Sequence, residues 1–172
     1  MITFFTRLTT FTNYVILYYM LKIITNPNPI LRQKSQPIKD ITAKELQALI
    51  PEMAETMIKK DGVGLAAPQI GQNIRLIVIR YKDDNLAMIN PKIIKKSFLK
   101  EWDEEGCLSV PNIFGDVKRC KKITIKYLDT SGQEQKLIGE GFLARVVQHE
   151  VDHLDGVLFI DKAKNLREYD NE

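Results

Sequence analysis

The segment from residue 141 to 154 is the strongest constraint on the fold, because a helix there would be apolar on nearly every side. Six apolar residues leave only the side with the histidines and the glutamate polar: Phe142, Leu143, Val146, Val147, Val151 and Leu154. A helix with so little polar surface is buried inside a protein. Gly156 is the expected end of this helix. We therefore expect a helix in the middle of the fold, with sheets packed over it.

Both histidines of the chain lie on this helix, in the sequence His149-Glu150-Val151-Asp152-His153. Residues four apart on a helix share a side, so the two imidazoles can bind one metal ion. Glu150 would project beside that ion, where it can accept a proton from water. The alternative is that both histidines only pack against or cap the helix. We favour the metal site because the chain has no other histidine.

The composition is that of one globular domain. The 172 residues can bury a continuous core, and a hydrophobic fraction of 44% with 27% charged residues excludes a disordered or fibrous chain. A net charge of +3 gives no reason to expect specific nucleic-acid binding. Cys107 and Cys120 form neither a C-x-x-C pair nor a disulfide framework. This fits a reducing compartment and leaves a thiolate available as a metal ligand.

Residues 1 to 19 differ from the rest of the chain. Arg7 is their only charged residue, and Thr and Asn residues interrupt the apolar stretches, so we expect neither a membrane span nor a signal peptide. Because the chain has no acidic residue before Asp40, its start faintly resembles an organelle transit peptide. We favour the alternative that the functional chain begins at Met20. The expected organisation is a leader or upstream extension over 1–19, outside the fold, and a single catalytic domain over 20–172.

A second helix and four strands complete the expected fold. Thr42 and Glu45 form a capping-box pattern that predicts a helix running to about Lys60, with a kink at Pro51. Four segments carry residues that strands favour: 75–81, 87–89, 117–129 and 133–138. Antiparallel strands segregated from few helices make the chain an α+β protein. We expect antiparallel β-sheets packed around the central buried helix that carries H-E-x-x-H.

A catalytic metal site with two imidazoles needs at least one further protein ligand. Cys107 is the best candidate, because Gly106 before it allows a tight turn and Pro111 after it stiffens the chain. A lone cysteine is more commonly a buried small hydrophobe. Three acids after the histidines are further candidates, although each could equally be solvated: Asp155, Asp161 and Glu168.

The segment 62–71, with the sequence GVGLAAPQIG, is rich in small residues. It is not a phosphate-binding loop, because no Lys-Ser/Thr pair follows it and no βαβ unit frames it. Small residues let the backbone approach a substrate or the metal ligands. Gln69 supplies the one side-chain amide donor, which suits a carbonyl oxygen that gains charge during attack. The alternative is a packed loop with Gln69 exposed.

Together these three segments resemble the peptide deformylase family. That family is marked by a G-x-G-L-A-A-x-Q loop, an E-G-C-L-S loop and a Q-H-E-x-D-H helix, in this order. The chain carries all three, at 62–69, 105–109 and 148–153. Each motif alone is weak, but three in order at compatible spacings are specific, and the resemblance spans about residues 21 to 161. It implies removal of the formyl group from the starting methionine of new polypeptides, with release of formate.

The resemblance also implies roles for individual residues. The metal ligands would be Cys107, His149 and His153, and Glu150 would be the acid and base. Gln69 and the backbone N–H of Leu108 would hold the formyl oxygen. The cofactor would be one divalent metal ion per chain, Fe²⁺ by resemblance to the family and Zn²⁺ as the alternative. A thiolate with two imidazoles suits either ion.

The substrate would bind as an added β-strand, with the methionine side chain in an apolar pocket. We place Gly64, Ile70 and Val146 in the substrate-binding site, with Leu108 at the pocket or its rim. Ile70, Val146 and Leu108 could instead belong to the core. Two acids, Glu105 and Asp152, are expected to support the site by orienting ligands or the glycine-rich loop. The alternative is that either acid pairs with a nearby arginine, such as Arg145.

Nascent formyl-Met peptides are the expected partners, and a transient ribosome contact stays open. Some relatives dock on the ribosome through a long basic carboxyl-terminal helix, which the balanced charges of residues 162–172 do not predict here. The basic run 118–122 could substitute, although a solvated strand edge explains it as well. We expect cytoplasmic localisation, with organelle targeting by the leader left open.

Two other classes of function compete with the deformylase. A metal-dependent peptidase or other amidase could use the same Cys/His/His site. A non-catalytic relative could keep the fold as a binding module. Glu150 argues against the binding module, because a metal site that only binds does not require a base.

Overall fold

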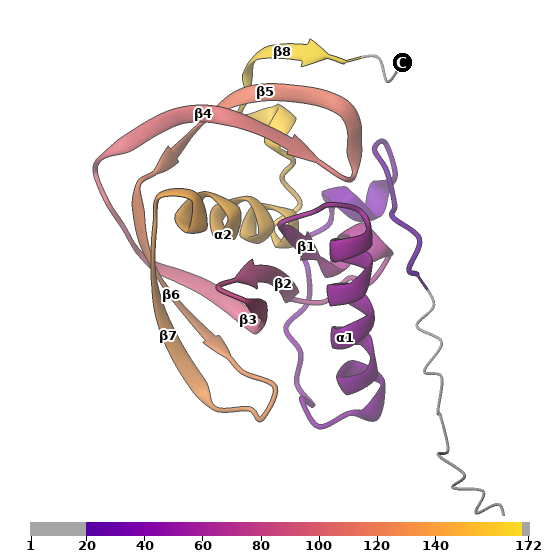
Figure 1. Ribbon diagram of the computed structural model, residues 1–172. Helices are drawn as coiled ribbons and strands as arrows, with labels where there is room; N and C mark the ends of the chain where they lie inside the picture. The colour runs from indigo at the N-terminus through magenta and orange to yellow at the C-terminus, as the bar shows by residue number, and fades with distance from the viewer. Residues whose placement is uncertain (1–19, 170–172) are drawn as a thin grey trace, which may run out of the picture.

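The computed structural model describes residues 20–169, which form two antiparallel sheets on either side of a central helix (Figure 1). The larger sheet has the strand order β1-β2-β3-β6-β7, with β1 (Gly64–Ala66), β2 (Leu76–Tyr81), β3 (Asp84–Lys96), β6 (Lys122–Leu128) and β7 (Glu134–Glu140). The smaller sheet has the order β4-β5-β8, with β4 (Lys100–Cys107), β5 (Val110–Cys120) and β8 (Lys164–Glu168). The α+β class and the antiparallel pairing are confirmed.

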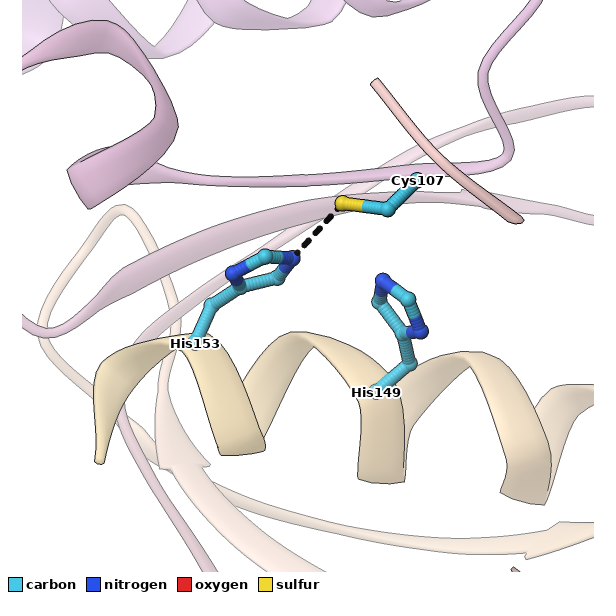
Figure 2. Close-up of side chains that lie close together, drawn as sticks. All are labelled: Cys107, His149 and His153. Carbon is cyan, nitrogen blue, oxygen red and sulfur yellow. Dashed lines mark hydrogen bonds between the residues drawn. The ribbon is translucent and has the colours of Figure 1, made fainter. Parts of the chain in front are cut away.

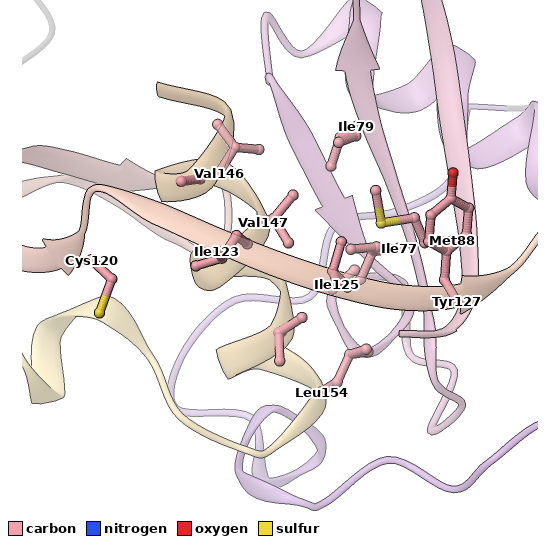
Figure 3. Packing of buried hydrophobic residues seen from close by; sticks show 13 residues of the cluster. Ile77, Ile79, Met88, Cys120, Ile123, Ile125, Tyr127, Val146, Val147 and Leu154 are labelled. Atoms are coloured by element: carbon pink, nitrogen blue, oxygen red, sulfur yellow. The ribbon is translucent and has the colours of Figure 1, made fainter. Parts of the chain in front are cut away.

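Helix α2 (Gly141–Leu154) lies between the two sheets and has the bounds that the sequence predicts (Figure 1). Its apolar side packs against the larger sheet, where Val147 and Leu154 of the helix are buried with Ile77 and Ile125 of the strands (Figure 3). Gly156 follows the helix at φ +74, and a Cβ there would lie 2.6 Å from the carbonyl oxygen of Arg32. A glycine therefore ends this helix for two reasons, its backbone conformation and a close chain contact.

Helix α1 (Lys44–Lys59) covers the outer side of β1 and β2 and runs continuously through Pro51. The predicted capping box is wrong, because the helix is capped at Ala43 without a side-chain hydrogen bond. The hydroxyl of Thr42 instead donates to the carboxylate of Asp40 at 2.7 Å. A charged acceptor two residues away outcompetes the helix N–H groups for this side chain.

The strands depart from the sequence prediction in three places. The block 117–129 is divided at Lys121, so that its first part belongs to β5 and its second part to β6. Strand β3 extends well beyond 87–89, and β4 and β8 were not predicted. Both missed strands are rich in charged residues and lack an apolar alternation, so the period of two that marks a half-buried strand is absent from their sequences. Three short 3₁₀ turns complete the fold: Pro29–Arg32, Ala67–Ile70 and Phe159–Asp161.

The leader predicted over residues 1–19 lies outside the described residues. Among helices in the range 20–169, none has the length and apolar character needed to span a membrane.

Replacing Leu154 by Ala tests the packing of α2 on the larger sheet. Leu154 is fully buried in that core, so its truncation should lower the free energy of unfolding by about 2–5 kcal/mol. Urea unfolding with a chelator present measures this without a contribution from metal binding. Ile138→Ala on β7 is the control, because its side chain is 55% exposed and its loss should cost no more than about 0.5 kcal/mol. Equal losses in both variants would contradict the packing described.

Candidate active site

Helix α2 and the end of β4 bring a thiol and two imidazoles together (Figure 2). His149 and His153 are one helical turn apart, and Cys107 Sγ lies 3.2 Å from His153 Nε2. One ligand atom from each of the three residues lies within 4.8 Å of the others. A thiolate with two imidazoles is a donor set that suits zinc or ferrous iron, and the spacing lets all three reach one ion. The residues therefore fit a divalent metal ion, with a coordination position left for solvent or substrate.

Cys107 is held by a β-hairpin. It ends β4, a turn at Leu108 and Ser109 follows, and β5 begins at Val110. The tight turn expected at Gly106 lies instead at Leu108 and Ser109, because Gly106 and Cys107 still belong to β4. The backbone N–H of Ser109 donates to Cys107 Sγ at 3.4 Å, which helps to fix the position of the sulfur. A Cβ at Gly106 would lie 2.6 Å from the ring of Phe114, so this position requires glycine.

Glu105 fixes the orientation of His149. Nδ1 of His149 donates to Glu105 Oε2 at 2.9 Å, which leaves Nε2 for a metal ion. Burial raises the pKa of Glu105, but hydrogen bonds from Arg119 and His149 outweigh it and hold the pKa far below its usual range. The carboxylate therefore stays ionised and keeps accepting from the imidazole. The predicted supporting role of Glu105 thus has a direct geometric basis.

His153 is the second imidazole of the three-residue group, one helical turn after His149. Burial, and then the charge of neighbouring His149, lowers the pKa of His153 well below its ordinary value. A neutral imidazole is the form that binds metal. Burial lowers the pKa of His149 as well, but Cys107 and Glu105 raise it above its ordinary value. Metal binding must therefore displace a proton, and it should weaken as the pH falls.

Arg119 is buried, so the interpretation of residues 118–122 as a solvated strand edge is wrong at this position. It belongs to the basic run 118–122, but it is only 4% exposed and donates twice to Glu105, both bonds 2.9 Å long. It also pairs with Asp152, which Lys162 contacts at 2.6 Å. The missed signal is the alternation along β5: Val117 and Arg119 share the buried side of the strand, and Lys118 between them faces the other side.

Arg145 is the second buried arginine, one turn before His149 on α2. Its guanidinium donates to Glu105 Oε1 at 2.7 Å, to the carbonyl of Val117 at 2.9 Å and to the carbonyl of Glu101 at 3.2 Å. The pairing of Glu105 with Arg145 that the sequence left open is therefore present. A lone arginine on an otherwise apolar helix was the signal for it.

Glu150 is buried beside the three potential ligands. Its Oε2 has no hydrogen-bond partner among the described residues, and burial raises its pKa to about 7. A Cβ at Gly64 would lie 2.3 Å from Glu150 Oε1, so the glycine of β1 makes room for this carboxylate. A carboxyl group with a pKa near neutrality can both accept and return a proton.

Gln69 lies in the 3₁₀ turn after β1 and is only 2% exposed. Its Oε1 accepts from the backbone N–H of Ala66 at 2.7 Å, and its Nε2 lies 3.5 Å from Cys107 Sγ. The amide oxygen is thus occupied within its own loop, which turns the N–H₂ group toward the cysteine. The alternative of an exposed Gln69 is excluded.

A cavity of about 490 Å³ opens beside this group. Its lining includes seven of the nine residues that the sequence assigns to catalysis, metal binding or substrate binding: Gly64, Gln69, Cys107, Leu108, Val146, His149 and Glu150. His153 lies behind it, and Ile70 is not in the lining but packs on the core beneath α1. Sequence reasoning missed the aromatic walls Phe114 and Phe142, whose roles depend on strand pairing and on the start of α2.

A group of residues that could hold a metal ion, with a carboxyl group and an apolar cavity, is typical of metal-dependent hydrolases. Comparisons with known proteins identify which one. A family model described as polypeptide deformylase matches residues 20–169. The peptide deformylase of Syntrophomonas wolfei is 50% identical over 146 residues, which cover 85% of this chain and 95% of the relative. That of Carboxydothermus hydrogenoformans is 48% identical over 145 residues, covering 84% and 94%.

Solved structures agree. The crystal structure of peptide deformylase from Thermotoga maritima superposes with a TM-score of 0.82 at 42% identity, covering 85% of this chain and 99% of that one. A peptide deformylase from Synechococcus elongatus, in complex with actinonin, gives 0.81 at 43% identity, covering 84% and 79%. The chain belongs to the peptide deformylase family. It is a hydrolase that removes the N-terminal formyl group from new polypeptides.

Replacing Gly64 by Ala should displace the Glu150 carboxylate, because the new methyl group and Oε1 would occupy the same space. We expect kcat for formate release to fall about 10²-fold or more, the loss typical of a misplaced general base, while metal content is unchanged. Gly139→Ala in β7 is the matched control, since its nearest contacts are at an ordinary 3.4 Å. An unchanged kcat in the Gly64 variant would show that the glycine does not make room for the base.

Proposed function

We propose that Cys107, His149 and His153 hold one divalent metal ion and that Glu150 is the acid and base of deformylation. The observation that supports this best is Oε2 of Glu150, which is buried without a hydrogen-bond partner among the described residues, on a side chain that lines the same cavity as Cys107 and His149. A buried carboxylate without a partner is costly, so it is retained where a proton must be moved.

The reaction adds water to the formyl carbon and breaks the bond from that carbon to the amine. A bound divalent ion supplies Lewis acidity and lowers the pKa of water toward about 7. Glu150 accepts the proton of the attacking water and returns it to the leaving amine, so that formate and a free amino terminus result. A pKa near neutrality suits both transfers, since neither form is strongly favoured.

Gln69 and the backbone N–H of Leu108 are the proposed donors to the formyl oxygen as it gains negative charge. The support for Gln69 is its locked amide, whose donor faces Cys107. Leu108 follows Cys107 directly and lines the cavity. Losing one such donor typically reduces the rate about 10²–10³-fold.

The substrate peptide is proposed to bind as an extended strand. The cavity is lined by residues of β1 and of β4, and each is an edge strand of its sheet. Edge strands offer free backbone groups to an added strand. Gly64 and Val146 line the proposed site for the methionine side chain with Leu108, whereas Ile70 has no place in it.

Ferrous iron is the proposed native ion, and zinc is the alternative that the donor set accepts equally. We propose that the enzyme works in the cytoplasm, because both cysteines are free thiols and one is a ligand. The leader over 1–19 and its effect on localisation stay predictions. A ribosome contact through 118–122 loses support, because Arg119 is buried and both Lys121 and Lys122 are paired with glutamates.

Glu150→Gln tests the acid and base assignment. The amide keeps the size of the side chain but cannot accept a proton, so turnover of formyl-Met peptides should fall about 10²–10⁴-fold while metal content stays at one ion per chain. Formate release and elemental analysis after anaerobic purification measure both. Retained turnover would remove the assignment. Unformylated peptides are assayed beside the formyl-Met peptides, because a general peptidase would cleave them and a deformylase would not.

Cys107→Ala tests the ligand set. Loss of the thiolate leaves two imidazoles, so the variant should lose bound metal as well as activity. Cys120→Ala is the matched control, because Cys120 is equally a free thiol but is buried away from the histidines, in the core between α2 and the larger sheet. It should keep full metal content. Metal loss in the control, or full occupancy in the Cys107 variant, would contradict the proposed ligands.

A further inference from the structure

The connection between β3 and β4 exposes two large apolar side chains. Phe98 is 103% exposed and Leu99 is 72% exposed. We call these two residues the Phe98–Leu99 tip. Its backbone is well anchored, because Ser97 N donates to the carbonyl of Lys122 at 2.8 Å and Lys121 N donates to that of Leu99 at 2.9 Å. The side chains therefore project from a fixed turn.

Four lysines flank this tip. Lys92, Lys95, Lys96 and Lys100 are all exposed, and no acidic residue occurs from residue 86 to 100. None of the four forms an ion pair with another residue in the described part of the chain. Nearby Lys121 and Lys122, by contrast, pair with glutamates. We call these four residues the lysine cluster; their uncompensated positive charge surrounds an apolar tip.

Trp102 extends this surface along β4. It is 45% exposed, and the ammonium groups of Lys118 and Lys164 lie 5.7 and 5.1 Å from its ring centroid. A tryptophan with an exposed apolar ring and a polar N–H suits the boundary between lipid and water. It is also the single tryptophan of the chain.

We propose that the Phe98–Leu99 tip and the lysine cluster dock the enzyme on the surface of a membrane that contains anionic lipids. The two apolar side chains enter the boundary between headgroups and acyl chains, while the lysines neutralise lipid phosphates. Lysine stems can lie along the apolar region with their ammonium groups in the headgroup layer. This binding is peripheral and involves no spanning segment.

The chemistry of the surface favours lipid over other anionic partners. All the charges of the cluster are lysines, whereas RNA recognition relies strongly on the planar fork and stacking of arginine. Of the two tip residues only Phe98 has an aromatic face, and the aliphatic side chain of Leu99 suits the acyl region of a bilayer better than it suits a base. A second copy of the chain would bring two positive clusters together and be repelled.

The docking surface is separate from the catalytic side chains. Gly141 N donates to the carbonyl of Lys121 at 2.9 Å, so the tip adjoins the start of α2. His149 lies about 12 Å further along that helix at 1.5 Å per residue. Hydrolysis of a free formyl-Met peptide should therefore not depend on the tip, and the inference does not rest on the proposed catalytic roles.

The test uses the full, metal-loaded chain and vesicles of phosphatidylcholine, alone or with about one third phosphatidylglycerol. Sedimentation measures binding, and the emission of Trp102 reports insertion. We expect binding and a blue shift only with the anionic vesicles, and weaker binding at high salt. Phe98→Ser with Leu99→Ser should weaken binding about 10-fold or more. Lys95→Gln with Lys96→Gln should weaken it about 25-fold, or fivefold per lysine, from ~1 kcal/mol each.

Matched controls lie elsewhere on the surface. Ile138→Ser removes an exposed apolar side chain from β7, and Lys39→Gln removes an exposed lysine from the chain before α1. Both should bind vesicles as the unmodified chain does, and every variant should keep its deformylation rate. Absence of binding to anionic vesicles at low salt would overturn the proposal, as would equal binding by the tip variants. Binding to purified ribosomes that the tip variants lose, without vesicle binding, would assign the surface to RNA and overturn it too.

Discussion

The Glu105 carboxylate accepts hydrogen bonds from Arg119, Arg145 and His149, and the active site depends on this arrangement. A carboxylate has about four lone-pair positions, and these four bonds use all of them. Glu105 lies on β4, two residues before its end, Arg119 lies on β5, and the other two lie on α2. The same group therefore attaches the smaller sheet to the central helix and sets the orientation of His149, one of the three proposed metal ligands. Loss of the carboxylate would remove the buried negative charge that both guanidinium groups share, which is strongly destabilising.

The contact between β1 and α2 also serves both the active site and the stability of the fold. Gly64 contributes no side chain to the core, and Glu150 Oε2 stays buried with no hydrogen-bond partner in the range 20–169. A glycine inside a strand and a buried carboxyl oxygen without a partner are each unfavourable for folding. Together they create a protected carboxylate beside the metal ligands. The apolar packing of α2 on the larger sheet offsets this cost, since Val147 and Leu154 are fully buried on its other side.

The parts of this structure that the sequence predicts are the local ones. The H-E-x-x-H pattern and the apolar run require only helical spacing, so α2, His149 and His153 were predicted in place. Cys107 was found by its turn-forming neighbours and by the need for a third ligand. Arg119 was misplaced because its burial depends on which strands pair. In the sequence, its basic neighbours resemble a solvated strand edge. The structure instead pairs this part of β5 with β4. The charged strands β4 and β8 were missed for the same reason, since pairing rather than composition defines them.

X-ray absorption at the metal edge of the zinc-loaded enzyme tests the central claim most directly, because it reports ligand atoms and not activity. One sulfur at about 2.3 Å and two nitrogens at about 2.0–2.1 Å are the expected shell, completed by one light atom from solvent. That result would place Cys107 and both imidazoles on a single ion. A shell of nitrogen and oxygen alone would contradict the account, because it would remove the sulfur that β4 brings to the helix.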